Sequence, residues 1–170
     1  MFDKRFGYIH EKINPEEPNV MHIDLNSCFA TIEQQANPHL RGRPVGVTNR
    51  ISPECCMVAL SYEAKAYGAK VGMRHSEVRA MVPGLIVVET DPPKYHYAYE
   101  KLMAIMKSYS PKVEMKSIDE GIIDFHGTRN NVNNRSLKDI GNEIKDRLRE
   151  DIGCWMKCNI GISTNRFLAT

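Results

Sequence analysis

The sequence lacks any apolar run close to the roughly 20 residues that a membrane-spanning helix requires. Its first residues, Met1 to Arg5, have no apolar segment of the kind that signal peptides carry. Internal repeats and low-complexity tracts are absent as well. We therefore expect a cytoplasmic globular protein that has no membrane partner.

Cysteine is scarce and is not arranged in pairs. The five cysteines are an odd number, and no two of them form a Cys-x-x-Cys motif. A zinc ribbon and a disulfide framework both need such pairing, so neither is indicated. We expect reduced thiols.

The sequence also lacks a strong charge of either sign. Its 23 Lys and Arg residues against 21 Asp and Glu residues leave a formal net charge of +2. This balance permits a polyanionic partner without requiring one, because the local grouping of charges matters more than their sum. A chain of 170 residues with 42% hydrophobic residues is long enough for one core or for two small lobes.

One acidic dipeptide stands out against this ordinary background. Asp119 and Glu120 lie between two strand-like runs, 113–116 and 121–125. Successive strand residues point to opposite faces, so the two acids cannot both be solvent-facing residues of a regular strand. At the corner of a hairpin they would converge on one hard cation. A hairpin turn with two solvated acids is the simpler interpretation of the dipeptide taken alone.

A third acid ends the apolar run 20–25. Asp24 precedes a helix-like stretch, 27–36, for which Ser27 is the expected N-cap. Open α/β sheets place their chemistry at the carboxyl ends of strands, just before helices. If this strand lies beside the hairpin, Asp24, Asp119 and Glu120 form a cluster of like charges, the arrangement that two-metal phosphoryl-transfer sites use.

The order of the expected elements favours an α+β fold. Segments 20–36 and 95–163 match the split βαβ or ferredoxin-like order, and 37–90 reads as an inserted small lobe. The pattern predicts strands at 20–24, 44–48, 56–60, 85–88, 113–116, 121–125 and 157–163, and helices at 27–36, 62–67, from 76 to 82, at 95–109, at 136–152 and from 165. Because the last helix starts so close to residue 170, we expect the natural chain to continue.

Five motifs in a fixed order carry a resemblance to a known family. They cover residues 22–30 (HIDLNSCFA), 37–45, 61–68 (SYEAKAYG), 117–120 (SIDE) and 161–169 (GISTNRFLA). Together they resemble the amino-terminal half of the Y-family translesion DNA polymerases of the DNA polymerase IV type. The likeness covers about residues 20–170.

The resemblance implies a polymerase architecture. Residues 20–27 plus 91–170 would form a ferredoxin-like palm, the catalytic domain, and residues 28–90 an inserted small fingers lobe. The thumb and little-finger domains of the family would lie beyond residue 170. Residues 1–19 have no counterpart and are expected to be an extended lead-in.

The resemblance also implies the catalytic residues. Asp24, Asp119 and Glu120 would be catalytic and would bind two Mg²⁺ ions, joined by the backbone carbonyl of Leu25. One metal activates the primer 3′-hydroxyl, and the other neutralises the triphosphate and the leaving pyrophosphate.

Substrate-binding positions carry over in the same way. Phe29 matches the aromatic steric gate that excludes a 2′-hydroxyl, although a core residue on a helix is its alternative interpretation. The resemblance assigns the incoming triphosphate to Ser27, to the backbone amides of Cys28 and Phe29, and to the side chains of Tyr62, Lys65 and Arg166. Three positions depart from the family pattern: Lys65 replaces an arginine, Cys28 an aromatic residue and Thr170 a lysine.

The implied function is template-directed DNA synthesis past damaged bases, by nucleotidyl transfer from a dNTP to a primer 3′-hydroxyl. Primer-template DNA and a dNTP are the expected partners, and a sliding clamp is a further one, through a C-terminal part beyond residue 170. Synthesis by residues 1–170 alone is expected to be weak. Two alternatives stay open at this point: a non-catalytic, polymerase-like accessory or scaffold subunit, and a nucleotide cyclase on a similar palm.

Overall fold

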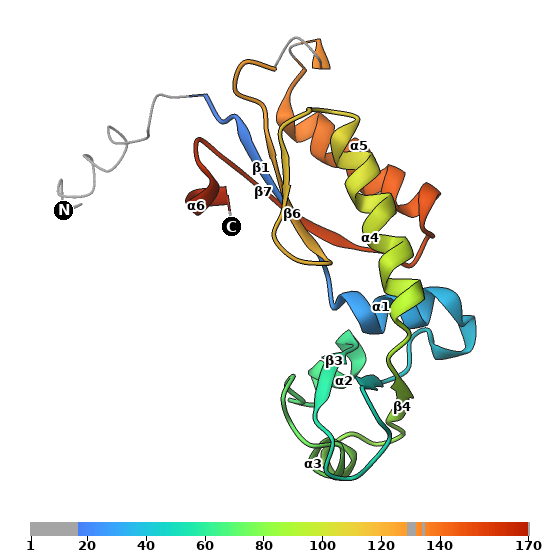
Figure 1. Cartoon of the computed structure of the whole chain (residues 1–170). Coiled ribbons are helices and arrows are strands. Elements are labelled where there is room, and N and C mark those ends of the chain that lie inside the picture. The colour runs from blue at the N-terminus through green and yellow to red at the C-terminus, as the bar shows by residue number, and fades with distance from the viewer. Residues whose placement is uncertain (1–16, 129–131, 134, 170) are drawn as a thin grey trace, which may run out of the picture.

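The computed structural model describes residues 17–128, 132, 133 and 135–169, and these form two lobes, each built on its own sheet (Figure 1). The elements in chain order are β1 (Val20–Leu25), α1 (Cys28–Ala36), the 3₁₀ helix η3 (Pro38–Leu40), β2 (Val45–Thr48), β3 (Met57–Leu60), α2 (Tyr62–Ala66), α3 (His75–Met81), β4 (Ile86–Glu89), α4 (Pro92–Lys107), β5 (Val113–Met115), β6 (Glu120–Asp124), α5 (Leu137–Asp151), β7 (Cys158–Ser163) and α6 (Arg166–Ala169).

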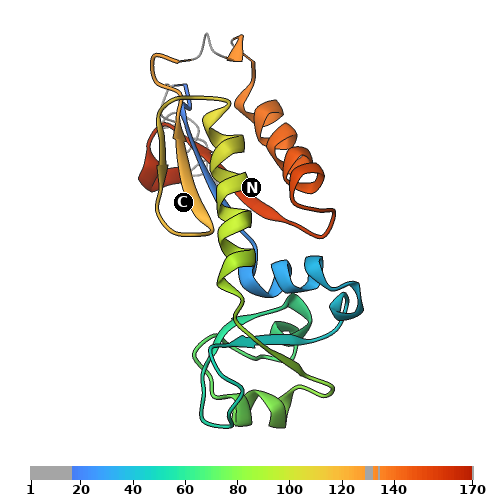
Figure 2. The same cartoon turned by 45° about the vertical axis from the view of Figure 1, so that its right-hand side comes forward.

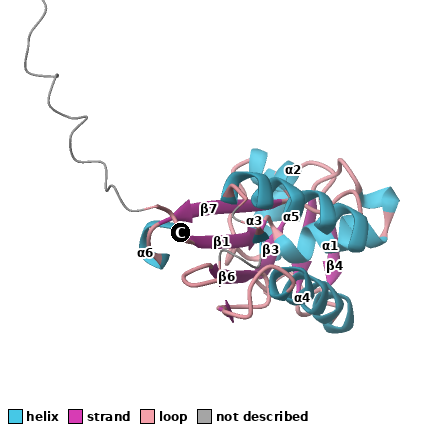
Figure 3. Ribbon diagram, turned by 90° about the horizontal axis from the view of Figure 1, so that it is seen from above, coloured by secondary structure: helices cyan, strands magenta, loops and turns pink. Residues whose placement is uncertain are grey.

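The large lobe has a four-stranded sheet in the order β5-β6-β1-β7, with every neighbouring pair antiparallel. The side-by-side run of β6, β1 and β7 is visible in Figure 3. This strand order is that of a split βαβ unit, so the predicted ferredoxin-like fold is confirmed. Helices α4 and α5 cover one face of the sheet, and α6 lies on the other (Figures 1 and 2).

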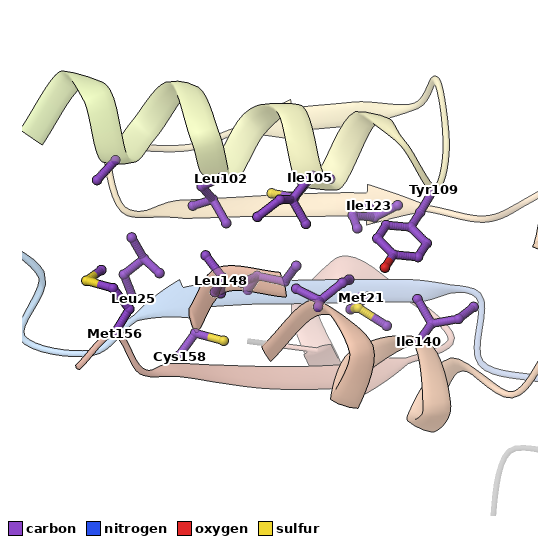
Figure 4. Close-up of a cluster of buried hydrophobic side chains, with 14 of the residues drawn as sticks. Met21, Leu25, Leu102, Ile105, Tyr109, Ile123, Ile140, Leu148, Met156 and Cys158 are labelled. Atoms are coloured by element: carbon purple, nitrogen blue, oxygen red, sulfur yellow. The ribbon is translucent and has the colours of Figure 1, made fainter. Parts of the chain in front are cut away.

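Alternation along β1 divides its side chains between these two faces. Met21, Ile23 and Leu25 are buried beneath α4 and α5, where they join the main core (Figure 4). His22 and Asp24 therefore point to the opposite, open face, since successive strand residues alternate. This face carries the candidate functional residues.

The small lobe is the predicted insertion. Its sheet has the order β3-β2-β4, in which β2 is antiparallel to β3 and parallel to β4. It has a core of its own, formed by Met57, Leu60, Ala64, Ala69, Val78, Val82 and Leu85. Gly68, at a φ of 87°, follows α2 closely, in the left-handed region that glycine tolerates without strain.

Helix α1 belongs to both lobes. Cys28 and Ile32 join the core of the large lobe, while Ala30 packs against Val47 and Ala59 of the small lobe. Figures 1 and 2 both show α1 between the two sheets. The expected boundary of the fingers at residue 28 stays a prediction, since the helix that starts there contacts both sheets.

Several smaller expectations are also decided by the structure. All five cysteines are free thiols, as predicted. Within the described ranges, no helix combines the length and the apolar character that crossing a membrane would take. The expected lead-in over residues 1–19 falls outside the described residues as far as residue 16, and Thr170 lies outside them too.

Candidate active site

Three carboxylates meet where β1 ends beside the β5–β6 turn. Asp24 lies directly opposite Glu120, the first residue of β6. Asp119 is the last residue of the turn, and its carbonyl accepts a 2.9 Å hydrogen bond from the backbone N–H of Leu25. The structure therefore brings together Asp24, Asp119 and Glu120, as the sequence pattern predicts.

The cluster is electrostatically strained. Burial raises the pKa of Asp24, and the nearby carboxylates of Asp119 and Glu120 raise it further, against a smaller opposite effect of His22 and Lys65. When all three carboxylates are ionised, they repel one another unless a cation lies among them. The site is thus one that a divalent ion would stabilise.

Two of the three acids are held by neighbouring side chains. Glu120 Oε1 lies 2.7 Å from His22 Nε2, and Ser117 Oγ donates to Asp119 Oδ1 over 2.6 Å. Accordingly, among the residues placed in the structure, no three His, Cys, Asp or Glu side chains are already grouped around one metal position. Binding of an ion would require Glu120 and Asp119 to turn from these partners.

The chemistry of the donor set fits a hard cation such as Mg²⁺. Asp24, Asp119, Glu120 and the backbone of Leu25 all offer oxygen, the ligand that Mg²⁺ prefers. Burial, followed by the charges of Asp119 and Asp24, raises the pKa of the Cys28 thiol far above its usual range.

A pocket of about 280 Å³ opens beside the acids, between the large-lobe sheet and the small lobe. Its lining comes from both lobes and comprises Asp24, Leu25, Ser27, Cys28, Phe29, Val58, Ala59, Leu60, Lys65, Val71 and Asp119. Seven of the ten site residues expected from the sequence lie in this wall. The lobes thus share a site that neither forms alone.

Ser27 occupies the N-cap position of α1 but does not cap it. Its φ of 48° is left-handed, and its side chain makes no capping hydrogen bond, so that part of the prediction is wrong. Its Oγ instead accepts a 2.8 Å hydrogen bond from Lys65 Nζ, across the pocket. Such backbone strain is common at functional sites, where the surrounding structure holds the residue in an unusual conformation that fixes the direction of its side chain.

Phe29 lines the pocket and also packs against the core, so its role as a steric gate stays a prediction. Its ring lines the pocket and is stacked on the ring of Tyr95 at 4.2 Å between centroids, with an interplanar angle of 12°. The Tyr95 hydroxyl donates to Glu33 Oε1 over 2.9 Å. The packing of the core thereby fixes one face of Phe29 and leaves the ring at the wall of the pocket.

Tyr62 and Lys65 lie together on α2, and Lys65 lines the pocket. Lys65 Nζ is 5.9 Å from the ring centroid of Tyr62, whose side chain is about half exposed. A residue missed by the sequence argument, Lys157, approaches the same ring at 5.8 Å. No motif marks Lys157, so only the folded arrangement identifies it.

Arg166 does not line this pocket. Its guanidinium lies 3.9 Å from Glu114 Oε2, beside another pocket on the open face. The cause is the strand direction: β7 runs antiparallel to β1, so Ser163 pairs with Val20, at the far end of β1 from Asp24. A triphosphate-binding role for Arg166 stays a prediction.

Comparison with known proteins agrees with this geometry. The impB/mucB/samB family matches the chain over residues 23–170. The chain is 34% identical over 151 residues to DNA polymerase IV 1 of Bacillus subtilis, and 35% identical over 156 residues to DNA polymerase IV of Moorella thermoacetica. These alignments cover 88% and 89% of the chain but only 35% and 37% of the two relatives, so the chain spans about a third of their length.

Solved structures give the same result. An insertion ternary complex of Dbh DNA polymerase superposes with a TM-score of 0.77 at 26% sequence identity, over 88% of this chain and 44% of that one. DinB from Sulfolobus solfataricus superposes with a TM-score of 0.77 at 25% identity, over 88% of this chain and 43% of the other.

Proposed function

Because the chain belongs to the impB/mucB/samB family of Y-family DNA polymerases, we propose that it forms the palm and fingers of a translesion DNA polymerase. The reaction would be nucleotidyl transfer from a dNTP to a primer 3′-hydroxyl, directed by a template that includes damaged bases. The single observation that supports it most is the cluster of Asp24, Asp119 and Glu120 beside a pocket shared by both lobes.

Polymerases of this family generally depend on a divalent metal. We propose two Mg²⁺ ions here, held by Asp24, Asp119, Glu120 and the carbonyl of Leu25. When bound, such ions activate the 3′-hydroxyl and neutralise the charge of the triphosphate and pyrophosphate. Asp24 would keep its place on β1, while Glu120 would exchange its contact with His22 for the ion.

Other residues of the chain would position the nucleotide. The backbone amides of Cys28 and Phe29, at the N-terminus of α1, suit an anion because helix N-terminal N–H groups have no partner within the helix. Lys65 and Tyr62 would contact the triphosphate from the small lobe. The ring of Phe29, held by Tyr95, would exclude a 2′-hydroxyl by occupying its space.

The partners of the proposed polymerase are primer-template DNA and a dNTP. The two related structures named above are DNA polymerases of the same fold, one of them a ternary complex. A thumb, a little finger, a clamp-binding segment and a cytoplasmic location belong to the proposal for the whole protein. Since phosphate contacts supply much of the affinity for nucleic acid, residues 1–170 alone would bind DNA weakly.

The proposal is tested by isothermal titration of the chain with a dNTP in Mg²⁺. Asp119→Ala/Glu120→Ala is expected to abolish metal-dependent binding. The matched control is Asp139→Ala/Glu150→Ala, two exposed acids of α5, which should bind as the wild type does.

Equal binding by wild type and Asp119→Ala/Glu120→Ala would show that the acids are not the site. If the wild type binds no dNTP, single-nucleotide incorporation on a primer-template, with the chain in excess, decides between two cases. Incorporation that requires the acids would mean that DNA completes the site. Its absence would favour the scaffold alternative.

A further inference from the structure

Two lysines from different lobes lie near one tyrosine ring, and one of them, Lys65, lines the pocket. Lys65 Nζ, from α2 of the small lobe, lies 5.9 Å from the ring centroid of Tyr62. Lys157 Nζ, from the segment before β7 of the large lobe, lies 5.8 Å from the same centroid. The aromatic face attracts each ammonium group, but the two positive charges repel each other.

Lys157 is anchored close to the acids. Its carbonyl accepts a 2.9 Å hydrogen bond from the N–H of Asn26, two residues after Asp24. Asn159, two residues beyond Lys157 on β7, pairs with Asp24. The backbone of Lys157 therefore has a fixed place at the end of β1, where the carboxylates lie.

The segment that carries Lys157 is also tied to α1. The backbone N–H of Trp155 donates to Gln35 Oε1 over 2.8 Å, and the indole N–H donates to Gln34 Oε1 over 3.0 Å. The guanidinium of Arg41 and the ammonium of Lys157 each lie 5.6 Å from the centroid of the Trp155 ring. These contacts fix the segment, and the exposed side chain of Lys157 lies beside the Tyr62 ring.

No carboxylate within 4.0 Å neutralises Lys157 or Lys65 in the part of the chain that the structure covers. Two exposed cations beside one ring, next to a group of acids that suits a divalent metal, match a polyphosphate bound to that metal. The metal neutralises the inner oxygens of such a ligand, and the ammonium groups meet the outer ones.

We propose that Lys157, which like Lys65 lies near the Tyr62 ring, is a phosphate-binding residue for the outer phosphates of the incoming nucleoside triphosphate. The inference rests on the proposed function, because the nucleotide must lie between the acids and α2. The proposal also accounts for Lys65, which stands where the family pattern has an arginine. A lysine offers one point charge in place of arginine's two-pronged contact, and Lys157 would supply the second contact with the phosphates.

The test is isothermal titration of the full chain in Mg²⁺ with dATP, dADP and dAMP. Lys157→Gln should weaken dATP binding by about fivefold to tenfold, as expected for one charged contact with phosphate at an exposed site. It should leave dAMP binding unchanged, and Lys157→Arg should restore dATP binding. Raising the salt concentration should shrink the difference, because salt screens the contact.

The matched control is Lys101→Gln. Lys101 Nζ lies 5.5 Å from the Tyr97 ring on α4, so this variant loses the same kind of lysine–tyrosine contact away from the pocket. It should bind all three nucleotides as the wild type does. Thermal midpoints of both variants are measured alongside.

Four outcomes would overturn the inference. If Lys157→Gln binds dATP as Lys101→Gln does while the wild type still needs Asp119 and Glu120, only Lys157 is excluded and the proposed function stands. An equal loss for dATP and dAMP would assign Lys157 a purely structural role, and a loss confined to binding of a single-stranded oligonucleotide would assign it to nucleic acid. Absence of binding by the wild type would overturn the isolated nucleotide site together with this inference.

Discussion

The carboxylates around Asp24 lower the stability of the fold by repelling one another. Asp24 is partly buried, lies opposite Glu120 and is close to Asp119. Unfolding separates the three charges and exposes them to water. The free chain therefore carries a repulsion that a bound cation would remove, a common trade between stability and activity at functional sites.

The first prediction concerns Asp24→Asn. The folded-state pKa of Asp24 is raised, so the stability linked to its protonation is present at acidic pH and is lost as the pH rises through the raised pKa. The asparagine side chain of Asp24→Asn does not ionise, so the variant does not lose this stability as the pH rises. We expect a higher thermal midpoint than wild type at neutral pH in chelator, by a few degrees for each kcal/mol of repulsion removed, measured by thermal unfolding.

In Mg²⁺, we expect the wild type to have a higher thermal midpoint than Asp24→Asn. The wild type is expected to gain stability from the ion and Asp24→Asn to gain little, because the amide is a poor ligand. Asp139→Asn, an exposed acid in the first turn of α5, serves as the control and should respond to Mg²⁺ like the wild type. A thermal midpoint of Asp24→Asn below that of wild type in chelator would contradict the prediction.

Sequence alone is informative for the acids and less so for the cations. Asp24, Asp119 and Glu120 follow from strand ends and a turn, which local pattern determines well. Arg166 and Lys157 depend on how distant segments pack. Helix α6 folds over the open face beside Glu114, and the Trp155 contacts fix the segment of Lys157, which lies beside the Tyr62 ring. The spacing of residues along the sequence does not indicate such contacts.

Among the helices, α5 contains a glycine that limits its stability. Gly141 lies in the helix interior, where glycine costs about 1 kcal/mol relative to alanine. A Cβ built there would lie 3.5 Å from Ile160 and 3.8 Å from Met21, which are ordinary contacts. We therefore predict that Gly141→Ala raises the free energy of unfolding by about 0.5–1 kcal/mol, measured by urea denaturation.

In contrast to Gly141→Ala, Gly161→Ala is expected to lower the free energy of unfolding. A Cβ on Gly161 would clash with the carbonyl oxygen of Ala169, so α6 must move away from the sheet. Ala169 packs against Val20 and Ile122, and the methyl NMR signals of these two residues should shift. Unchanged signals would show that α6 is not held against this face in solution.

Glu33 joins α1 to α4 through a buried carboxylate. Its two oxygens accept hydrogen bonds from Lys94 Nζ at 2.8 Å and from the Tyr95 hydroxyl at 2.9 Å. We predict that Glu33→Gln lowers the free energy of unfolding by about 1–3 kcal/mol, because it disrupts a buried, charge-assisted network. Urea denaturation measures the change.

The control for Glu33→Gln is Glu100→Gln, which removes an exposed i,i+4 contact of 3.6 Å with His96. Such a surface pair contributes at most about 0.5 kcal/mol. If both substitutions had equally small effects, the Glu33 network would not hold α1 to α4.

At the scale of the whole molecule, the two lobes have separate cores of different size. Twenty buried residues form the main core of the large lobe, whereas seven form that of the small lobe. Apolar burial is the main source of stability, so the small lobe should open more readily. We predict less hydrogen-exchange protection in β2, β3 and β4 than in β1, β6 and β7.

A dNTP with Mg²⁺ should narrow this difference in protection, because the proposed ligand contacts both lobes and binds only when both are folded. Measurement of exchange at the Lys65 and Ala59 peptides, with and without nucleotide, checks this. Equal protection of the two sheets in the free chain would show that the molecule unfolds as one unit.

The order of elements was predictable for both lobes because hydrophobic periodicity and turn residues are local signals. The split βαβ assignment followed from that order, and the strand pairing confirms it. The double role of α1 was not predictable. Its residues face two cores on different sides, and one amphipathic pattern cannot reveal which partner covers each side.

The link between Glu33 and Lys94 also bears on how such a chain can diversify. The small lobe leaves the large lobe after α1 and returns at α4, and the link joins these two points. The elements between these two points, from η3 to β4, form a small lobe with its own core, and the link holds the two ends of this lobe together. A substituted small lobe from a relative must match the surface of α1 and the segment of Trp155 and Lys157, so the lobe can be exchanged by recombination while Asp24, Asp119 and Glu120 stay in place.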